Sequence, residues 1–194
     1  LSGGWLLLTL IMVMIVDTFL GTGIPTTPSY ILTVVVGGAA MMKLGVGLLP
    51  AHLFAFYFGV LADVTPPVAI AAYASAAIAG SDPMKTGFEA FKLAIGGAIV
   101  PFIFVYHPAL ILQGPWQETV WIFFLASVCI ILTSAALTGW FIGPTSWTER
   151  LLLCAAAMGL VATSRQVVIP AGALAIGLFL WQALRFKSGR SRAA

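Results

Sequence analysis

Two long apolar stretches of this chain are each interrupted by proline near their middle. These interruptions restrict the folds that the chain can adopt. The first, residues 5–42, contains Gly-Thr-Gly-Ile-Pro-Thr-Thr-Pro at residues 21–28. The second, residues 50–79, contains Asp-Val-Thr-Pro-Pro at residues 63–67. Hydrocarbon cannot satisfy free backbone groups, so non-helical backbone at membrane depth survives only inside protein or beside a water-filled cavity. A pair of interrupted apolar segments therefore points to a transporter's binding site.

Composition places the chain in a membrane. It is 61% hydrophobic and only 8% charged, whereas soluble domains carry about 25% charged residues. Its mean hydropathy is +1.08. The net charge of +3 does not indicate nucleic acid, because no basic face with interleaved aromatic residues is visible. The sequence predicts an all-α integral membrane protein that has membrane lipid, and no nucleic acid, as a partner.

The two interruptions predict different elements. The first stretch is interpreted as one membrane-crossing helix that is broken near its middle, at residues 21–28. Residues 50–79 are interpreted as a re-entrant hairpin of two short antiparallel helices. Pro66 and Pro67 would stop its first helix, and Thr65 would cap the second with Pro66 at the first helical position. One Pro-kinked helix that crosses the membrane is the alternative.

Further transmembrane helices are expected after the hairpin, separated by short polar loops. They are predicted at residues 88–112, 119–142, 147–163 and 167–185. We interpret residues 1–112 as part of a transport domain. Residues 113–194 would form a C-terminal helical extension that ends in a basic tail.

Basic residues predict the orientation, because they favour the cytoplasmic side of a membrane. If residues 50–79 form a hairpin, most basic residues share one face, and Arg165 is the exception. The residues on that face are Lys43, Lys85, Lys92, Arg150 and the tail residues Arg185, Lys187, Arg190 and Arg192. The C-terminus is therefore expected in the cytoplasm.

Helix ends inside the membrane can bind ions. The last carbonyls of a helix carry partial negative charge, and the first amides of the next carry partial positive charge. A coupling Na⁺ or H⁺ would suit the former and an anionic solute the latter. The candidate residues are Gly21, Thr22, Gly23, Thr26 and Thr27 at the first break, and Asp63, Thr65, Pro66 and Pro67 at the second. A sodium ion would lie near Thr65 and Thr26. The alternative for each threonine is a hydrogen bond to a carbonyl one turn earlier.

Two carboxylates lie within the apolar stretches, where an ionisable side chain is a functional candidate by default. Asp17 is a candidate coupling carboxylate, with a structural ion pair as its alternative. Asp63 could contribute to the ion site or cap the helix that follows.

The sequence contains no glycine-rich phosphate loop, nucleophile–base arrangement or metal-ligand cluster, so we expect no enzyme and no cofactor besides the coupling ion. Three functions compete. The first is an ion-coupled secondary transporter. The second is a channel or a structural membrane subunit without transport activity. The third is a membrane-embedded enzyme that uses Asp17 and Asp63 as a carboxylate pair.

Residues 15–112 resemble the C-terminal half of the large membrane subunit of TRAP (tripartite ATP-independent periplasmic) transporters, and most closely the fused permease of TAXI-type systems. The resemblance lies in the stretches at residues 21–27, 51–59, 63–69, 80–83 and 101–110. The last three predicted helices look like the C-terminal extension of the fused permeases. Because the chain begins at Leu1 inside an apolar run, we expect the C-terminal part of a longer polypeptide.

The resemblance implies import of a small, anionic organic solute driven by an ion gradient, across a bacterial or archaeal inner membrane. An extracytoplasmic solute-binding protein would deliver the solute. The remainder of the permease, with a first repeat and helices like those of a small subunit, would be a further partner. Many large subunits carry Asp where this chain has Pro25. The choice between Na⁺ and H⁺ coupling therefore stays open.

Overall fold

The computed structural model describes residues 5–161 and 165–190, and within these ranges its elements are helices. The chain divides into two compact units, Leu1–Ile111 and Leu112–Ala194. Each unit has its own core and is described separately.

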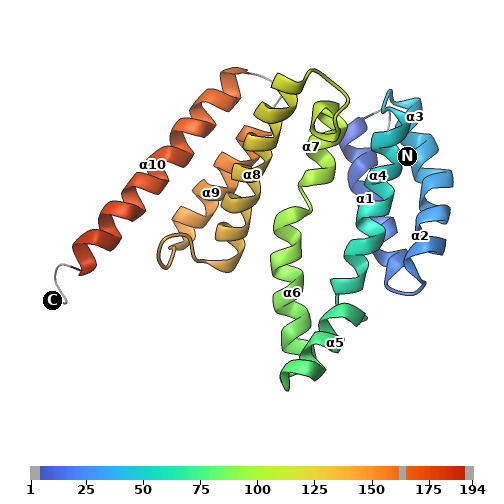
Figure 1. Cartoon of the computed structure of the whole chain (residues 1–194), viewed down its shortest axis with the longest axis horizontal. Coiled ribbons are helices and arrows are strands. Elements are labelled where there is room, and N and C mark those ends of the chain that lie inside the picture. Colours follow the sequence, from blue (N-terminus) through green and yellow to red (C-terminus); the bar gives the residue numbers. More distant parts are fainter. Residues whose placement is uncertain (1–4, 162–164, 191–194) are drawn as a thin grey trace. The chain divides into compact units, whose positions relative to one another are not determined.

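The first stretch folds back on itself. Helix α1 (Leu6–Gly21) is followed by a turn at residues 22–25. Helix α2 (Thr26–Thr33), a π-helical turn η1 (Val34–Gly38) and α3 (Ala39–Lys43) then form a second arm. Helices α1 and α2 contact each other, and Figure 1 shows both in the same part of the first unit, beside α4. We call residues 5–43 the α1–α3 hairpin.

Contacts between the arms show that they are antiparallel. Thr33 in the second arm donates a hydrogen bond of 2.7 Å to Asp17 in the first. A Cβ atom on Gly37 would lie 2.9 Å from Val13 Cγ2, so the arms also touch further from the turn. The prediction of a single broken crossing over residues 5–42 is therefore wrong. The physical reason is the turn, where the extended backbone of Pro25 (φ −56°, ψ 151°) reverses the chain before α2 begins.

The second stretch also differs from its prediction. It contains α4 (Leu48–Leu61), a 3₁₀ turn η2 (Ala62–Val64) and α5 (Ile70–Ala79). Helix α4 packs against α1, α2 and α7, whereas α5 packs against α6 (Figure 1). The partner of α5 is thus α6 instead of α4, and the antiparallel pair expected within residues 50–79 is not what the structure has.

The start of α5 explains part of this difference. Thr65 was expected to cap a helix beginning at Pro66, but α5 begins at Ile70, after a left-handed Ala69 (φ 35°). Thr65 instead ends the 3₁₀ turn, with its amide bonded to the Ala62 carbonyl at 3.0 Å. Non-helical residues 65–69 therefore separate the two helices.

The next long segment consists of α6 (Pro83–Gly97) and α7 (Val100–Tyr106), followed by a short turn η3 (Pro108–Ile111). It begins earlier than the expected residue 88, because Asp82 caps α6 by accepting a 2.8 Å hydrogen bond from the Lys85 amide. Where α6 gives way to α7, the Tyr57 hydroxyl donates 2.8 Å to the Gly97 carbonyl. This bond ties α4 to the α6–α7 segment.

Aromatic side chains of α4 and α7 form the centre of the core of the first unit. Phe54 and Phe58 are almost completely buried, and their ring centroids lie 4.9 Å apart. Phe102 of α7 packs edge-on against Phe54 at 5.3 Å. Leu10 of α1 and Met41 of α3 belong to the same core. The core packs α4 against the α1–α3 hairpin.

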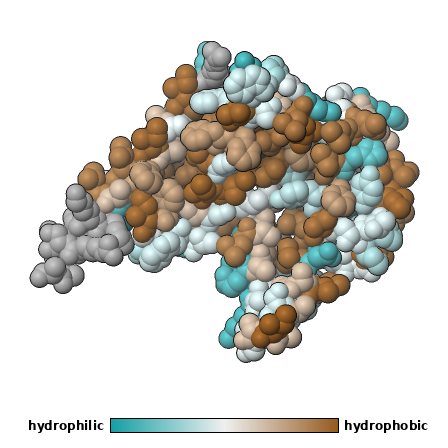
Figure 2. Space-filling view, viewed as in Figure 1, coloured by the Kyte–Doolittle hydropathy of each residue, from teal (hydrophilic) through white to brown (hydrophobic). Residues whose placement is uncertain are grey.

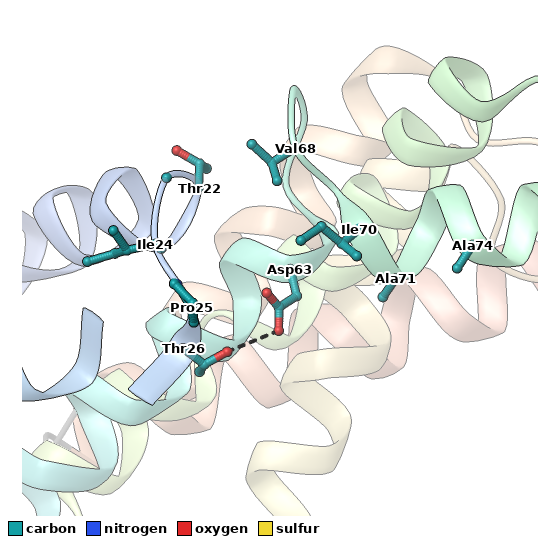
Figure 3. Close-up of a pocket in the computed structure, with 11 residues that line it drawn as sticks. Thr22, Ile24, Pro25, Thr26, Asp63, Val68, Ile70, Ala71 and Ala74 are labelled. Atoms are coloured by element: carbon teal, nitrogen blue, oxygen red, sulfur yellow. Dashed lines mark hydrogen bonds between the residues drawn. The ribbon is translucent and has the colours of Figure 1, made fainter. Parts of the chain in front are cut away.

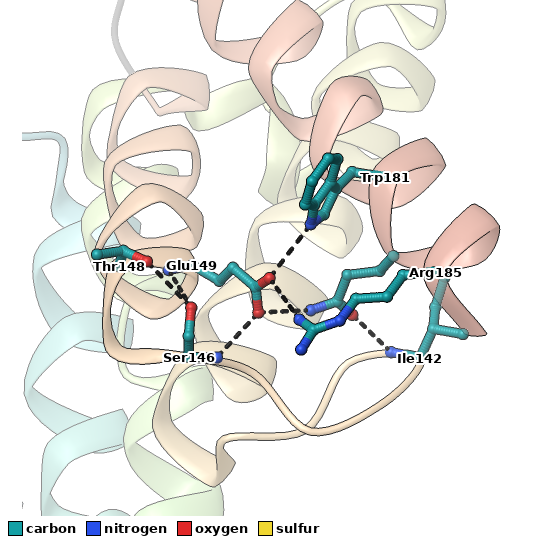
Figure 4. Close-up of polar contacts among 7 residues, drawn as sticks. Ile142, Ser146, Thr148, Glu149, Trp181 and Arg185 are labelled. Carbon is teal, nitrogen blue, oxygen red and sulfur yellow. Dashed lines mark hydrogen bonds and ion pairs between the residues drawn. The ribbon is translucent and has the colours of Figure 1, made fainter. Parts of the chain in front are cut away.

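The second unit contains α8 (Trp116–Thr138), α9 (Trp147–Leu160) and α10 (Arg165–Arg190), with α9 packed against both others. At the start of α9 the Glu149 carboxylate accepts from the Ser146 amide at 2.9 Å. It also accepts from three α10 side chains (Figure 4), Trp181, Gln182 and Arg185, at 3.2–3.3 Å. This polar cluster fastens α10 to α9. Of the predicted basic tail, Arg192 lies outside the described residues.

Three helical segments are long and apolar enough to cross a membrane, namely Pro83–Tyr106, Trp116–Thr138 and Gln166–Arg185. Large apolar side chains are exposed along them, including Phe123 at 65% and Ile169 at 71%. Figure 2 shows apolar residues over much of the visible surface. An exposed apolar surface of this extent fits a lipid environment, so the chain is a multi-pass membrane protein.

Candidate functional site

The tip of the α1–α3 hairpin, the interruption between α4 and α5 and the first turns of α5 line an open cavity of about 480 Å³. Its lining comes from segments that lie far apart in the sequence (Figure 3). The lining residues are Gly21, Thr22, Gly23, Ile24, Pro25, Thr26, Asp63, Val68, Ile70, Ala71 and Ala74. The two proline-containing breaks that the sequence singled out thus share one cavity.

A close helix contact at Gly21 lets the tip reach the interruption. Gly21 is buried at the end of α1. A Cβ atom there would lie 2.5 Å from the Ala62 Cβ and 3.2 Å from the Gly59 carbonyl oxygen. Only glycine fits at such a distance without a shift of α1 or α4. The absence of a side chain at Gly21 therefore positions the tip.

One hydrogen bond crosses the cavity wall. The Thr26 hydroxyl, in the first turn of α2, donates to Asp63 Oδ2 at 3.3 Å (Figure 3). Asp63 lies in η2 and is half-buried. The hydroxyl and carboxylate oxygens that meet here are ligands that a hard cation prefers. Among the described residues no group of three or more His, Cys, Asp and Glu side chains gathers to hold a transition metal.

The start of α2 carries partial positive charge, in contrast to the negatively charged oxygen atoms of Asp63. Its first residue, Thr26, follows Pro25, and no side chain caps this helix end. The first amides of a helix have no partners within it and carry partial positive charge. The cavity therefore combines acidic oxygen ligands from η2 with a helix N-terminus that favours an anion.

Other predicted site residues are bonded within their own helical turns. The Thr22 hydroxyl donates to the Phe19 carbonyl at 2.7 Å, although Thr22 still lines the cavity. The buried Thr65 hydroxyl donates to the Leu61 carbonyl at 2.9 Å. These are the one-turn-earlier hydrogen bonds expected of threonine in helices.

Several predicted residues do not contribute to the cavity lining. Thr27 and Pro67 are exposed, Thr65 is buried and Pro66 is half-buried, and none of the four lines the cavity. Their contribution to ion or solute binding stays a prediction.

Asp17 is not among the residues that line the cavity and lies between the two arms of the α1–α3 hairpin, about one helical turn from its tip. It is fully buried, and its Oδ1 accepts hydrogen bonds from Ser29 at 3.3 Å and Thr33 at 2.7 Å. Sequence reasoning missed these two partners. Their signal was present, since Ser29 and Thr33 are four residues apart and share one face of α2. Recognising their role requires knowing that the chain folds back.

The comparisons identify a family. A family sequence model, described as the tripartite ATP-independent periplasmic transporter, DctM component, matches residues 1–119 of the 194 residues. No curated protein and no solved structure matches the chain. The matched range contains both the hairpin tip and the interruption that form the cavity. The chain therefore belongs to the DctM family of TRAP transporter large components, which are secondary transporter permeases that act with a substrate-binding protein and a membrane partner subunit.

Proposed function

We propose that the chain is the C-terminal part of a permease that imports a small organic anion by coupling its passage to a cation gradient, and that the cavity between the hairpin tip and the α4–α5 interruption is the coupling site. The observation that carries this proposal is the Thr26–Asp63 hydrogen bond, which joins the two breaks across the cavity. An extracytoplasmic binding protein would deliver the solute. Its subclass would be the TAXI-type fused permease, on the resemblance of its motifs.

The coupling ion would bind at the acidic side of the cavity. The Thr26 hydroxyl, the Asp63 carboxylate and backbone carbonyls of residues 21–23 supply oxygen ligands of the kind Na⁺ accepts. The anionic solute would lie against the first turn of α2. With an ion bound, the positive charge beside that helix end would strengthen anion binding, which gives a physical basis for coupling.

The contacts also suggest an arrangement in the membrane. The arms of the α1–α3 hairpin would enter and leave on one side, with the tip at membrane depth. Helices α4 and α5 would cross in succession, interrupted at residues 62–69. Lys85 and Lys92, both in α6, favour a cytoplasmic position for the start of that helix. The loop before α8 contains no basic residue and would be extracytoplasmic. Both ends of the hairpin would lie on that side too, which moves Lys43, at the end of α3, away from the cytoplasmic face expected for it from the sequence.

The second unit would be an extension characteristic of fused permeases. The family match ends at residue 119, and the second unit begins at Leu112. Helices α8, α9 and α10 therefore lie almost wholly outside the matched range. We propose that they anchor the transport portion in a bacterial or archaeal inner membrane and end in the cytoplasm. The remainder of the permease would supply the first repeat and the small-subunit-like helices.

Uptake into proteoliposomes tests the proposed function. The complete permease and its binding protein would be reconstituted, and Na⁺ and pH gradients imposed one at a time. We expect solute to accumulate above its external concentration with one gradient, and to equilibrate when an ionophore dissipates that gradient. Equilibration under both gradients would instead indicate a channel. Asp63→Asn should abolish accumulation, whereas Thr133→Val, whose hydroxyl bonds within α8, serves as the control.

A further inference from the structure

Asp17 is a buried carboxylate that the cavity does not use. It lies four residues before Gly21, about one helical turn from the hairpin tip. Its side chain is 0% exposed. The hydroxyls of Ser29 and Thr33 both donate to Oδ1. Among the described residues, Oδ2 is buried and has no hydrogen-bond partner.

No cation neutralises Asp17 within the part of the chain that the structure describes. The titratable residues on the elements packed against α1 are Tyr30, Lys43, His52, Tyr57 and Asp63. Tyr30 and His52 bond each other at 2.7 Å, Tyr57 donates to Gly97, and Asp63 accepts from Thr26. Lys43 is exposed. None of the five forms a hydrogen bond or ion pair with Asp17.

These contacts fit an uncharged carboxyl group. An ionised carboxylate that is buried without a cation carries a large desolvation cost. The two hydroxyl donors and the nearby Gly59 backbone offset that cost only in part. A protonated carboxyl avoids that cost. Its Oδ1 remains the acceptor for Ser29 and Thr33, and its proton lies on Oδ2, the oxygen without a partner.

We propose that Asp17 is a proton-binding site that latches the two arms of the α1–α3 hairpin, separately from the ion site at the cavity. With the proton bound, Asp17 in the first arm holds Ser29 and Thr33 in the second. When the proton leaves to water, the buried charge favours separation of the arms, because only then can water reach the carboxylate. The latch itself does not depend on the proposed function. A role for its opening and closing in the transport cycle would rest on that function.

The opening between the arms gives a way to observe the latch. The arms flank a groove of about 590 Å³ that includes Val16 from α1 and Val36 from η1. Both side chains are exposed, at 51% and 74%. Spin labels at these positions, in a complete permease whose native cysteines are replaced, would report the distance between the arms as pH changes.

Asparagine is the informative substitution because it keeps an acceptor oxygen and cannot ionise. We expect the label distance to be short at low pH and to lengthen as pH rises in the parent protein. In Asp17→Asn the distance should stay short at every pH. Thr9→Val, which removes a buried α1 hydroxyl bonded only to the Trp5 carbonyl, should leave the parent response unchanged.

Infrared spectroscopy tests the proton itself. The difference between parent and Asp17→Asn permease at the low pH where the label distance is short should contain the carbonyl band of a protonated carboxylic acid, and that band should fade as the distance lengthens. A difference showing only carboxylate bands would overturn the proposal, as would an Asp17→Asn hairpin that is open at all pH values or that still opens with pH. These readouts need no transport, so a failure of solute uptake would count against the proposed function alone.

Discussion

Thr26 Oγ1 lies 3.3 Å from Asp63 Oδ2, and this bond joins the hairpin tip to a residue 37 positions later in the chain. Both partners line the same cavity. The contact joins the two interrupted segments in a single site. A substitution in either segment should therefore affect binding by groups of the other.

The cation dependence of uptake should separate Thr26 from Thr65. Thr26→Val removes the hydroxyl that faces Asp63, and we expect the cation concentration for half-maximal uptake to rise about tenfold, equivalent to about 1.4 kcal/mol. Thr65→Val removes a hydroxyl bonded to Leu61 within the same turn. It should lower stability slightly and leave the midpoint in place. A larger shift for Thr65→Val would put the cation near residue 65.

Gly21 should tolerate no side chain. An added Cβ would lie 2.5 Å from Ala62 Cβ, so Gly21→Ala should reduce the free energy of unfolding by about 1–3 kcal/mol through overpacking. At Gly23 the nearest atom would be 3.8 Å away, and Gly23→Ala is the matched control. Thermal unfolding of the purified permease in detergent measures both. Equal losses for the two variants would contradict the close approach of α1 and α4.

Glu149 should hold α10 against α9. Glu149→Ala leaves the Ser146 amide, the buried Gln182 amide and the Trp181 indole N–H without their acceptor, which should cost about 1–3 kcal/mol of stability. Glu149→Gln keeps an acceptor oxygen and should recover part of the loss. Glu118→Ala, at an exposed position in the first turn of α8, should change little. Chemical unfolding that gives the same midpoint for Glu118→Ala and Glu149→Ala would rule out this role.

Cysteine labelling in whole cells tests the arrangement in the membrane. In a permease without native cysteines, Gly45→Cys and Trp5→Cys should react with an impermeant reagent from the same face. Ser81→Cys should react from the opposite face, because α4 and α5 lie between residues 45 and 81. If residues 45 and 81 share a face, the crossing assigned to α4 and α5 is wrong.

Much of this organisation could be predicted from the sequence. Proline lacks a backbone N–H and is disfavoured inside a helix, so interruptions were expected at Pro25 and at Pro66 and Pro67, and the structure has both. Composition was sufficient to predict an all-helical membrane protein. The family match supports the resemblance carried by the motifs at both breaks.

The preferences of neighbouring residues do not determine after which interruption the next helix runs back antiparallel to the one before it. A proline interruption stops a helix, but the direction taken afterwards depends on contacts with distant residues. Here Asp17 pairs with Ser29 and Thr33 across the first break, whereas α5 finds its partner in α6. Such pairings depend on tertiary packing, and the hydropathy of a single stretch does not reveal them.

A double-mutant cycle at Thr26 and Asp63 tests the shared site most directly. The cation dependence of uptake would be measured for the parent permease, Thr26→Val, Asp63→Glu and the double variant, with Asp63→Glu chosen because it keeps the charge. If both side chains hold one cation, the effects should be non-additive, with a coupling of about 0.5–3 kcal/mol. Strictly additive effects would contradict a site formed jointly by the hairpin tip and the α4–α5 interruption.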